Sequence, residues 1–165
     1  MWNNTGYELR DSTTQQMMDR IDELQPRVIV ELGSGRSTVK LARWAATHNA
    51  HFTAIEHDER WAKQVRRRTR DSHFDYQIRP LKRGFYSGLT LPRGIQFALI
   101  DGPPGALSNG RRASLPTLWP YLADGAEVWM DDVDRPAEQE SISRWKVGLP
   151  LTDVELRGHL AVIRK

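Results

Sequence analysis

Residues 31–38, ELGSGRST, decide the fold of this chain. They follow a short β-branched run at residues 27–32, which is typical of a buried strand, and they lead into residues 37–48, whose apolar spacing predicts a helix. Glycines at such a turn let the backbone approach a ligand closely, and the first turn of the helix offers unbonded N–H groups. The stretch therefore predicts an α/β unit with a candidate ligand loop, although a tight turn without a ligand would use the same glycines.

The same alternation continues along the chain. Further strands are expected at residues 51–56, 74–81, 95–100 and 126–130, and helices at residues 11–24, 59–70, 112–122 and 136–148, with a loop at residues 83–94. Five strands alternating with helices predict an α/β fold with a Rossmann-like, doubly wound, mostly parallel sheet. Two final strand-like runs, residues 152–156 and 160–163, leave no room for a helix between them, so they predict a C-terminal antiparallel hairpin.

Length and composition indicate a single domain. The chain has 165 residues, of which 39% are hydrophobic and 27% are charged. We expect residues 27–165 to form a Rossmann-like domain and residues 1–26 a helical extension of it.

The lack of cysteine excludes thiol catalysis, zinc–thiolate sites and iron–sulfur clusters. There is no apolar run long enough to span a bilayer and no signal pattern at the N-terminus, so we expect a cytoplasmic protein without a membrane partner.

Two acidic residues accompany the glycine loop. Glu56 ends the second strand, 56 − 33 = 23 residues after Gly33, where an acid accepts hydrogen bonds from ribose hydroxyls. The alternative is a surface carboxylate that caps the next helix. A dinucleotide-binding loop would have a third glycine at the position of Thr38, and it rarely needs an acid just before the loop, where this chain has Glu31. The carboxylate of Glu31 suits a cationic or amino-bearing ligand better than a pyrophosphate.

These residues and the terminal hairpin resemble class I S-adenosylmethionine-dependent methyltransferases over nearly the whole chain. The stretches ELGSGRST, IEHDERW, LIDGPPG and MDDVDRP are most similar to a subgroup of small methyltransferases that carry a DGPPG turn. The resemblance implies S-adenosylmethionine as the cofactor, with its methionine part on the glycine loop and its ribose on the acid after the second strand. Ser37 departs from the family, which often has glycine at this position.

The resemblance also implies which residues bind S-adenosylmethionine, the methyl donor. The residues expected to bind the donor are Glu31, Gly33, Ser34, Gly35, Ser37, Thr38, Glu56, His57, Leu81 and Asp101. His57 follows the expected ribose acid, and Leu81 follows the third strand, so both are expected to flank the adenine.

Three aspartates follow neighbouring strands of the expected sheet. Asp101 follows the fourth strand, and Asp131 and Asp132 follow the fifth. Because the carboxyl ends of parallel strands meet at one edge, where ligands bind, these side chains are expected to lie together. Aspartates that only form turns or cap helices would follow the same pattern. Such a cluster suits a sulfonium or a divalent metal ion such as Mg²⁺.

The aspartates also resemble the catechol O-methyltransferase branch, in which an Asp and an Asp-Asn pair bind magnesium. This chain has Asp132 in place of the Asn. We expect Asp101 or Asp132 to be the catalytic base, acting directly or through a metal held by Asp101, Asp131 and Asp132.

The sequence thus predicts methyl transfer to a small molecule, with an oxygen nucleophile favoured because the carboxylates offer a base or metal ligands. One alternative is an NAD(P)-dependent reductase, and another is a non-catalytic domain of this fold that binds RNA or protein. The arginines within residues 60–70 are expected to form a solvated helix face, so nucleic acid is not expected as a partner. The sequence leaves open whether the protein forms a homo-oligomer. It has no large insertion that could cover the acceptor site, so another subunit could complete that site.

Overall fold

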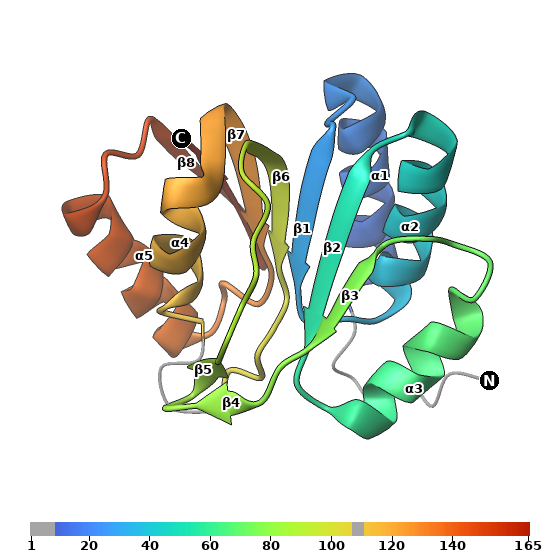
Figure 1. Ribbon diagram of the computed structural model, residues 1–165. Helices are drawn as coiled ribbons and strands as arrows, with labels where there is room; N and C mark the ends of the chain where they lie inside the picture. Colours follow the sequence, from blue (N-terminus) through green and yellow to red (C-terminus); the bar gives the residue numbers. More distant parts are fainter. Residues whose placement is uncertain (1–8, 107–110) are drawn as a thin grey trace.

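The computed structural model of this chain describes residues 9–106 and 111–165. Its main strands are β1 (Val28–Leu32), β2 (His51–Glu56), β3 (Asp75–Ile78), β6 (Ile95–Ile100), β7 (Leu122–Met130), β8 (Asp153–Arg157) and β9 (Leu160–Arg164). They form one seven-stranded sheet in the order β3-β2-β1-β6-β7-β9-β8 (Figure 1). The first five strands in this order are parallel, and β9 and β8 are antiparallel. The predicted Rossmann-like sheet with a C-terminal hairpin is confirmed.

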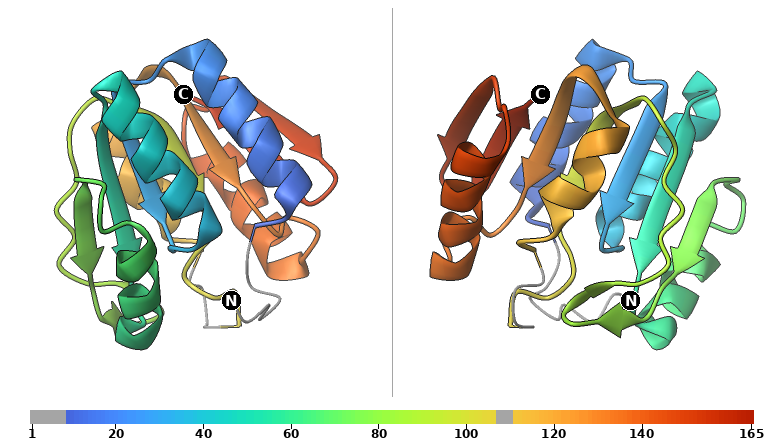
Figure 2. Two further views of the ribbon diagram at one scale, coloured as in Figure 1. Left: turned by 90° about the vertical axis from the view of Figure 1, so that its right-hand side faces the viewer. Right: turned by 60° about the vertical axis from the view of Figure 1, so that its left-hand side comes forward.

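Helices cover both faces of the sheet. The helices are α1 (Asp11–Leu24), α2 (Arg36–His48), α3 (Glu59–Arg68), α4 (Ser114–Leu118) and α5 (Pro136–Gly148), with a 3₁₀ turn, η1 (Trp119–Tyr121), after α4. Figure 2 shows α1, α2 and α3 on one face and α4 and α5 on the other. Within the described residues, no helix is both long enough and apolar enough to cross a membrane.

The core consists of two apolar layers, one on each side of the sheet. Met17 of α1 and Leu41 of α2 pack in one layer, and Leu115 of α4 packs in the other. Successive residues of β1 alternate between them, since Ile29 belongs to the first layer and Val30 to the second. Both faces of the parallel strands are therefore buried, which is why these strands read as continuous apolar runs rather than as alternating ones.

Several boundaries differ from the sequence prediction: the helix expected at residues 112–122 is shorter, as α4 followed by η1, and the helix expected at residues 59–70 ends at Arg68. The expected third strand ends early, at Ile78, and a separate antiparallel pair follows, β4 (Leu81–Lys82) and β5 (Phe85–Tyr86), where a loop was expected. Arg83 and Gly84 both have positive φ, as a tight hairpin turn with the twist of its strands requires. Arginine is not a turn signal of this kind, so the sequence pattern did not predict the hairpin. Strand β7 begins at Leu122, earlier than expected, because Leu122 pairs with Ile95 across a register shift.

Two glycines bring the loops after β1 and β6 into backbone contact. Gly33 has φ +88°, and a Cβ added there would lie 2.7 Å from the backbone nitrogen of Gly102. A Cβ at Gly102 would lie 2.7 Å from the Cα of Gly33 and 2.6 Å from the Tyr86 hydroxyl. The Gly102 N–H donates to the Leu32 carbonyl at 2.7 Å, which holds the two loops together. Neither position has room for a side chain.

This contact predicts that two Gly→Ala substitutions lower the folding stability by different amounts. Gly94 also has positive φ, +72°, but a Cβ there would meet no atom within 4 Å. Gly94→Ala should destabilise the protein by about 1–2 kcal/mol through its backbone conformation alone. Gly33→Ala should cost at least about 1 kcal/mol more, because the loops must also separate. Urea unfolding of both variants measures the difference, and equal costs would contradict the close backbone contact.

Candidate functional site

The residues expected at the site gather at the carboxyl ends of the parallel strands, along the lower edge of the sheet in Figure 1. The register aligns Leu32 of β1 with Ile55 of β2 and with Ile100 of β6, and Ile100 with Met130 of β7. The acidic residues that follow these positions are therefore brought to one level. The small hairpin β4–β5 lies at the same edge.

Glu31 supports the glycine loop from within the core. Its side chain has no exposed surface, and it accepts hydrogen bonds from the Ser37 hydroxyl at 2.5 Å and from the Thr38 hydroxyl at 2.6 Å. The Thr38 hydroxyl in turn accepts from the Gly35 N–H at 2.8 Å. Burial raises the pKa of Glu31 to about 8, with a further contribution from the charge of Glu56. The polar residues of the loop thus tie the start of α2 to β1.

Glu56 is an ionised carboxylate beside the glycine loop. Its Oε1 accepts from the backbone N–H groups of His57 and Asp58 at 2.7 and 2.9 Å, and its Oε2 accepts from the N–H and the hydroxyl of Ser34 at 3.0 and 2.9 Å. His57 Nδ1 lies 2.9 Å from Oε1. Burial alone would raise the pKa of Glu56, but His57 and these donors hold it below its usual value. The same contact with Glu56 raises the pKa of His57.

Two aromatic residues that the sequence analysis did not assign to the site hold the glycine loop from the other side. The indole N–H of Trp61, in α3, donates to the Ser34 carbonyl at 2.5 Å. The Tyr76 hydroxyl, on β3, lies 2.7 Å from the Ser34 hydroxyl. The only signal for these two residues in the sequence is that Trp61 is a lone tryptophan among the charged residues of α3. Hydrogen bonds between distant elements leave no periodic pattern.

The β4–β5 hairpin places Tyr86 beside His57 and the turn at Gly102, and Leu81 beside the core. Leu81 is half-buried and packs on the core, and the ring of Tyr86 lies edge-on to His57 with 6.4 Å between the ring centroids. The Tyr86 hydroxyl is buried and has no hydrogen-bond partner among the residues that the structure describes. Burial raises its pKa well above the usual value, so this hydroxyl stays a hydrogen-bond donor.

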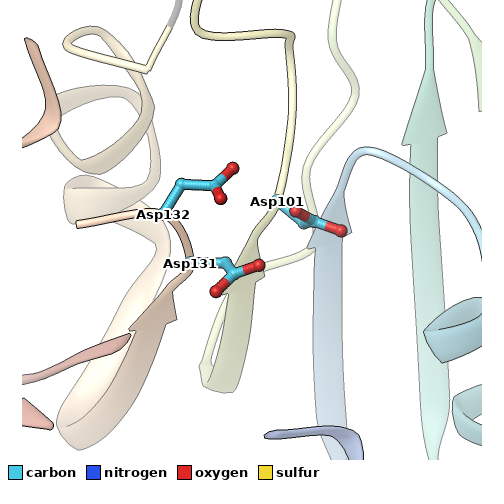
Figure 3. Close-up of side chains that lie close together, drawn as sticks. All are labelled: Asp101, Asp131 and Asp132. Atoms are coloured by element: carbon cyan, nitrogen blue, oxygen red, sulfur yellow. The ribbon is translucent and has the colours of Figure 1, made fainter. Parts of the chain in front are cut away.

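The three aspartates come together as expected. Asp101 follows β6, and Asp131 and Asp132 follow β7 (Figure 3). One carboxylate oxygen from each lies within 4.8 Å of one from each of the others. Burial raises the pKa of Asp101 well above its usual value and also raises that of Asp131, and the neighbouring carboxylates add to both effects. Asp132 has φ +62°, a left-handed conformation that turns the chain after β7.

Arg111, which the sequence analysis did not identify, lies inside this cluster with only 4% of its surface exposed. Its Nη2 donates to the Asp132 carboxylate at 3.0 Å and lies 3.8 Å from Asp101 Oδ1. Arg135 contacts the same Asp132 oxygen, Oδ2, at 2.8 Å. Arg111 occurs just before α4 in a stretch without a motif, so only the folded chain reveals its position.

The comparisons with known proteins agree with this geometry. A family model described as a methyltransferase domain matches residues 30–133, more than half of the chain. The chain belongs to this family. The match decides in favour of the methyltransferase interpretation over the reductase alternative. The sequence matches none of the curated proteins.

Solved structures resemble this methyltransferase domain over almost its whole length. An O-methyltransferase from Bacillus cereus in complex with SAH has a TM-score of 0.73 at 15% identity, with 99% of this chain and 85% of that chain covered. SAH-bound methyltransferase from Podospora anserina has a TM-score of 0.74 at 13% identity, with 99% and 82% covered. An RNA methyltransferase from Salinibacter ruber in complex with S-adenosyl-L-homocysteine has a TM-score of 0.58 at 19% identity, with 94% and 90% covered. At these identities the likeness establishes the fold.

The buried Glu31 carboxyl predicts a specific dependence of stability on pH. Its pKa is 4.5 in the unfolded chain and about 8 in the folded one, so the contribution of Glu31 is fully present below pH 4.5 and is lost as pH rises through 8. Glu31→Gln keeps a neutral group at all pH values. The variant should match the parent within about 1 kcal/mol at pH 5 and exceed its stability by at least about 2 kcal/mol at pH 8.5. Urea unfolding at both pH values measures this, and a constant difference would contradict a buried neutral Glu31.

Proposed function

We propose that this methyltransferase transfers the methyl group of S-adenosylmethionine to a hydroxyl group of a small molecule. The observation that supports the proposal is that two different carboxylate sites lie on the same edge of the sheet. The ionised Glu56 lies beside the glycine loop, and the Asp101–Asp132 cluster lies two strands away. Two neighbours crystallised with SAM or SAH are described as O-methyltransferases, and they support the same assignment.

The donor-side residues fit an adenosine-bearing ligand. Glu56 is a charged acceptor at the position where a ribose diol is held in this fold class. The Tyr86 hydroxyl is a buried donor without a partner among the described residues, and the junction of Gly33 and Gly102 carries no side chain. When bound, S-adenosylmethionine supplies an electrophilic methyl carbon on a sulfonium. We assign Glu56 to the ribose.

The remaining donor residues are assigned around the same ligand. His57 and Leu81 flank the adenine. The loop residues Gly33, Ser34 and Gly35 lie along the methionine part. Glu31, Ser37 and Thr38 fix this loop, since all three are joined by hydrogen bonds behind it. Asp101 closes the donor site on the side of β6.

The acceptor chemistry is assigned to Asp132. A hydroxyl is a weak nucleophile while it is protonated, so oxygen methylation needs a base close to the attacking oxygen. Asp132 has 20% of its side chain exposed and keeps its charge balanced by Arg111 and Arg135. It accepts the hydroxyl proton as the new C–O bond forms and the sulfonium S–C bond breaks. Asp101 is the alternative base, with 15% of its side chain exposed.

The charge of this edge favours a small acceptor over RNA. A nucleic acid would bring phosphates towards several carboxylates, which repel them. In the basic helix α3, the guanidinium carbon of Arg66 lies over the Tyr76 ring of β3, 5.3 Å from its centroid, and two strands separate β3 from β6. A phosphate-rich substrate is therefore disfavoured.

We also propose a division of the chain into a domain and an N-terminal extension. Residues 27–165 form the methyltransferase domain, and residues 1–26 form an extension of which the first eight lie outside the described residues. Met17 and Ile21 of α1 are fully buried against the sheet, so extension and domain share one core. The turn at residues 101–105 supports a place in the small DGPPG subgroup.

Donor binding provides the first test. S-Adenosylmethionine should bind the parent in calorimetry and NADH should not. Glu56→Ala removes a charged acceptor from the ribose and should weaken donor binding about tenfold to a hundredfold, equivalent to roughly 1.5–3 kcal/mol. Glu59→Gln, an exposed carboxylate three residues later, serves as the control and should bind as the parent does. A folded Glu56→Ala protein with parental affinity would remove Glu56 from the donor site.

Turnover provides the second test. A screen of phenols, sugars and amines with S-adenosylmethionine should detect transfer to hydroxyl groups. Asp132→Asn suits the left-handed backbone at this position, since asparagine adopts it readily. The variant should lower kcat by about 10²-fold or more and leave donor affinity within about twofold. Asp134→Asn, an exposed neighbour, is the control. Transfer to amines alone, or full kcat in Asp132→Asn, would reject the oxygen-acceptor assignment.

A further inference from the structure

Taken alone, the aspartate cluster has the composition of a divalent metal site. Three carboxylates supply oxygen ligands from two adjacent strand ends, and the nearest oxygens lie within 4.8 Å of one another. Hard cations such as Mg²⁺ and Mn²⁺ prefer such ligands. Whether this cluster takes a metal therefore depends on what else lies among the carboxylates.

A guanidinium group already lies among them. The Nη2 atom of Arg111 is 3.0 Å from Asp132 Oδ2 and 3.8 Å from Asp101 Oδ1, so it faces two of the three candidate ligands. Arg135 Nη1 lies 2.8 Å from the same Asp132 oxygen. A dication entering the cluster would have to approach two cations or displace them. Two of the three carboxylates that a metal would need therefore already face a guanidinium, whereas Asp131 Oδ1 is buried and has no hydrogen-bond partner among the described residues.

Backbone hydrogen bonds hold Arg111 in this place. Its Nε donates to the Pro103 carbonyl at 3.3 Å, its Nη1 to the Asp131 carbonyl at 2.7 Å, and its Nη2 to the Asp101 carbonyl at 2.8 Å. Two of these carbonyls belong to the turn after β6 and one to the end of β7, so the side chain joins both loops. Moving it out would leave buried carbonyls without donors, which is costly. A surface arginine would yield to a metal ion, whereas this one is part of the interior.

We propose that the Arg111 guanidinium occupies the place of a divalent metal ion at the Asp101–Asp131–Asp132 cluster, and that methyl transfer by this protein is metal-independent. The statement about transfer rests on the proposed function, whereas the exclusion of the metal does not. An arginine stays protonated throughout the physiological range, so its charge is permanent. It balances Asp132 as a metal would, but it does not coordinate and acidify an acceptor hydroxyl. The proton must then leave directly to a carboxylate.

Manganese titration tests the exclusion without any activity measurement. Electron paramagnetic resonance of free Mn²⁺ should show no binding to the parent with a Kd below about 1 mM. Arg111→Met should release the cluster and tighten Mn²⁺ binding at least about tenfold, and adding Asp131→Asn to it should abolish the gain. Arg112→Met, the adjacent and more exposed arginine, which pairs with Glu140 at 3.2 Å, should behave as the parent does.

If Arg111→Met does not fold, Mn²⁺ binding to the parent protein still tests whether the cluster excludes a metal ion. Mn²⁺ binding to the parent with a Kd below about 1 mM that is lost in Asp131→Asn would overturn the proposal. With a hydroxyl acceptor from the screen, transfer should change less than twofold between EDTA and added Mg²⁺, and activity that EDTA abolishes and Mg²⁺ restores would also overturn it. Absence of transfer under every condition would count against the proposed function, while the manganese result would still stand.

Discussion

Carboxylates crowded at one edge of a parallel sheet must each be protonated, paired or exposed, because burial and like charge both disfavour ionisation. This requirement shapes the whole functional edge of the protein. Glu31 and Glu56 lie near the ends of β1 and β2, and the three aspartates follow β6 and β7; because these strands are aligned in register, the sheet itself brings the acids together. The loops, the hairpin and the buried arginine are the elements that compensate for this concentration of negative charge.

The chain meets the requirement differently at each position. Burial keeps Glu31 neutral around pH 7, and two hydroxyls hold it in place. Backbone N–H groups and His57 keep Glu56 ionised. Arg111 and Arg135 balance Asp132. The edge therefore runs from the neutral Glu31 behind the glycine loop, through the ionised Glu56, to the cation-balanced aspartate cluster. This gradation suits a reaction in which a cationic donor becomes neutral as its methyl group leaves.

Much of this edge could be predicted from sequence, because its elements are local. The alternation of strands and helices predicted the sheet, the acids at strand ends predicted a cluster of aspartates at its carboxyl edge, and the structure confirms both. The β4–β5 hairpin was not predicted, since its turn contains Arg83 rather than a recognised turn pair. Trp61, Tyr76 and Arg111 were not predicted either. Their partners are loops that lie 8 to 42 residues away along the chain, and no periodicity marks such contacts.

The sequence by itself determined the alternation of strands and helices, the position of the glycine loop and the gathering of acids at one edge. These features follow from residue periodicity and from the rule that parallel strands end on the same side. Only the tertiary structure decided the ionisation of each acid, because a pKa depends on burial and on partners from other elements. It likewise decided that a guanidinium lies among the three aspartates. Residue 111 reaches them only once the turn after β6 and the end of β7 pack together around its side chain.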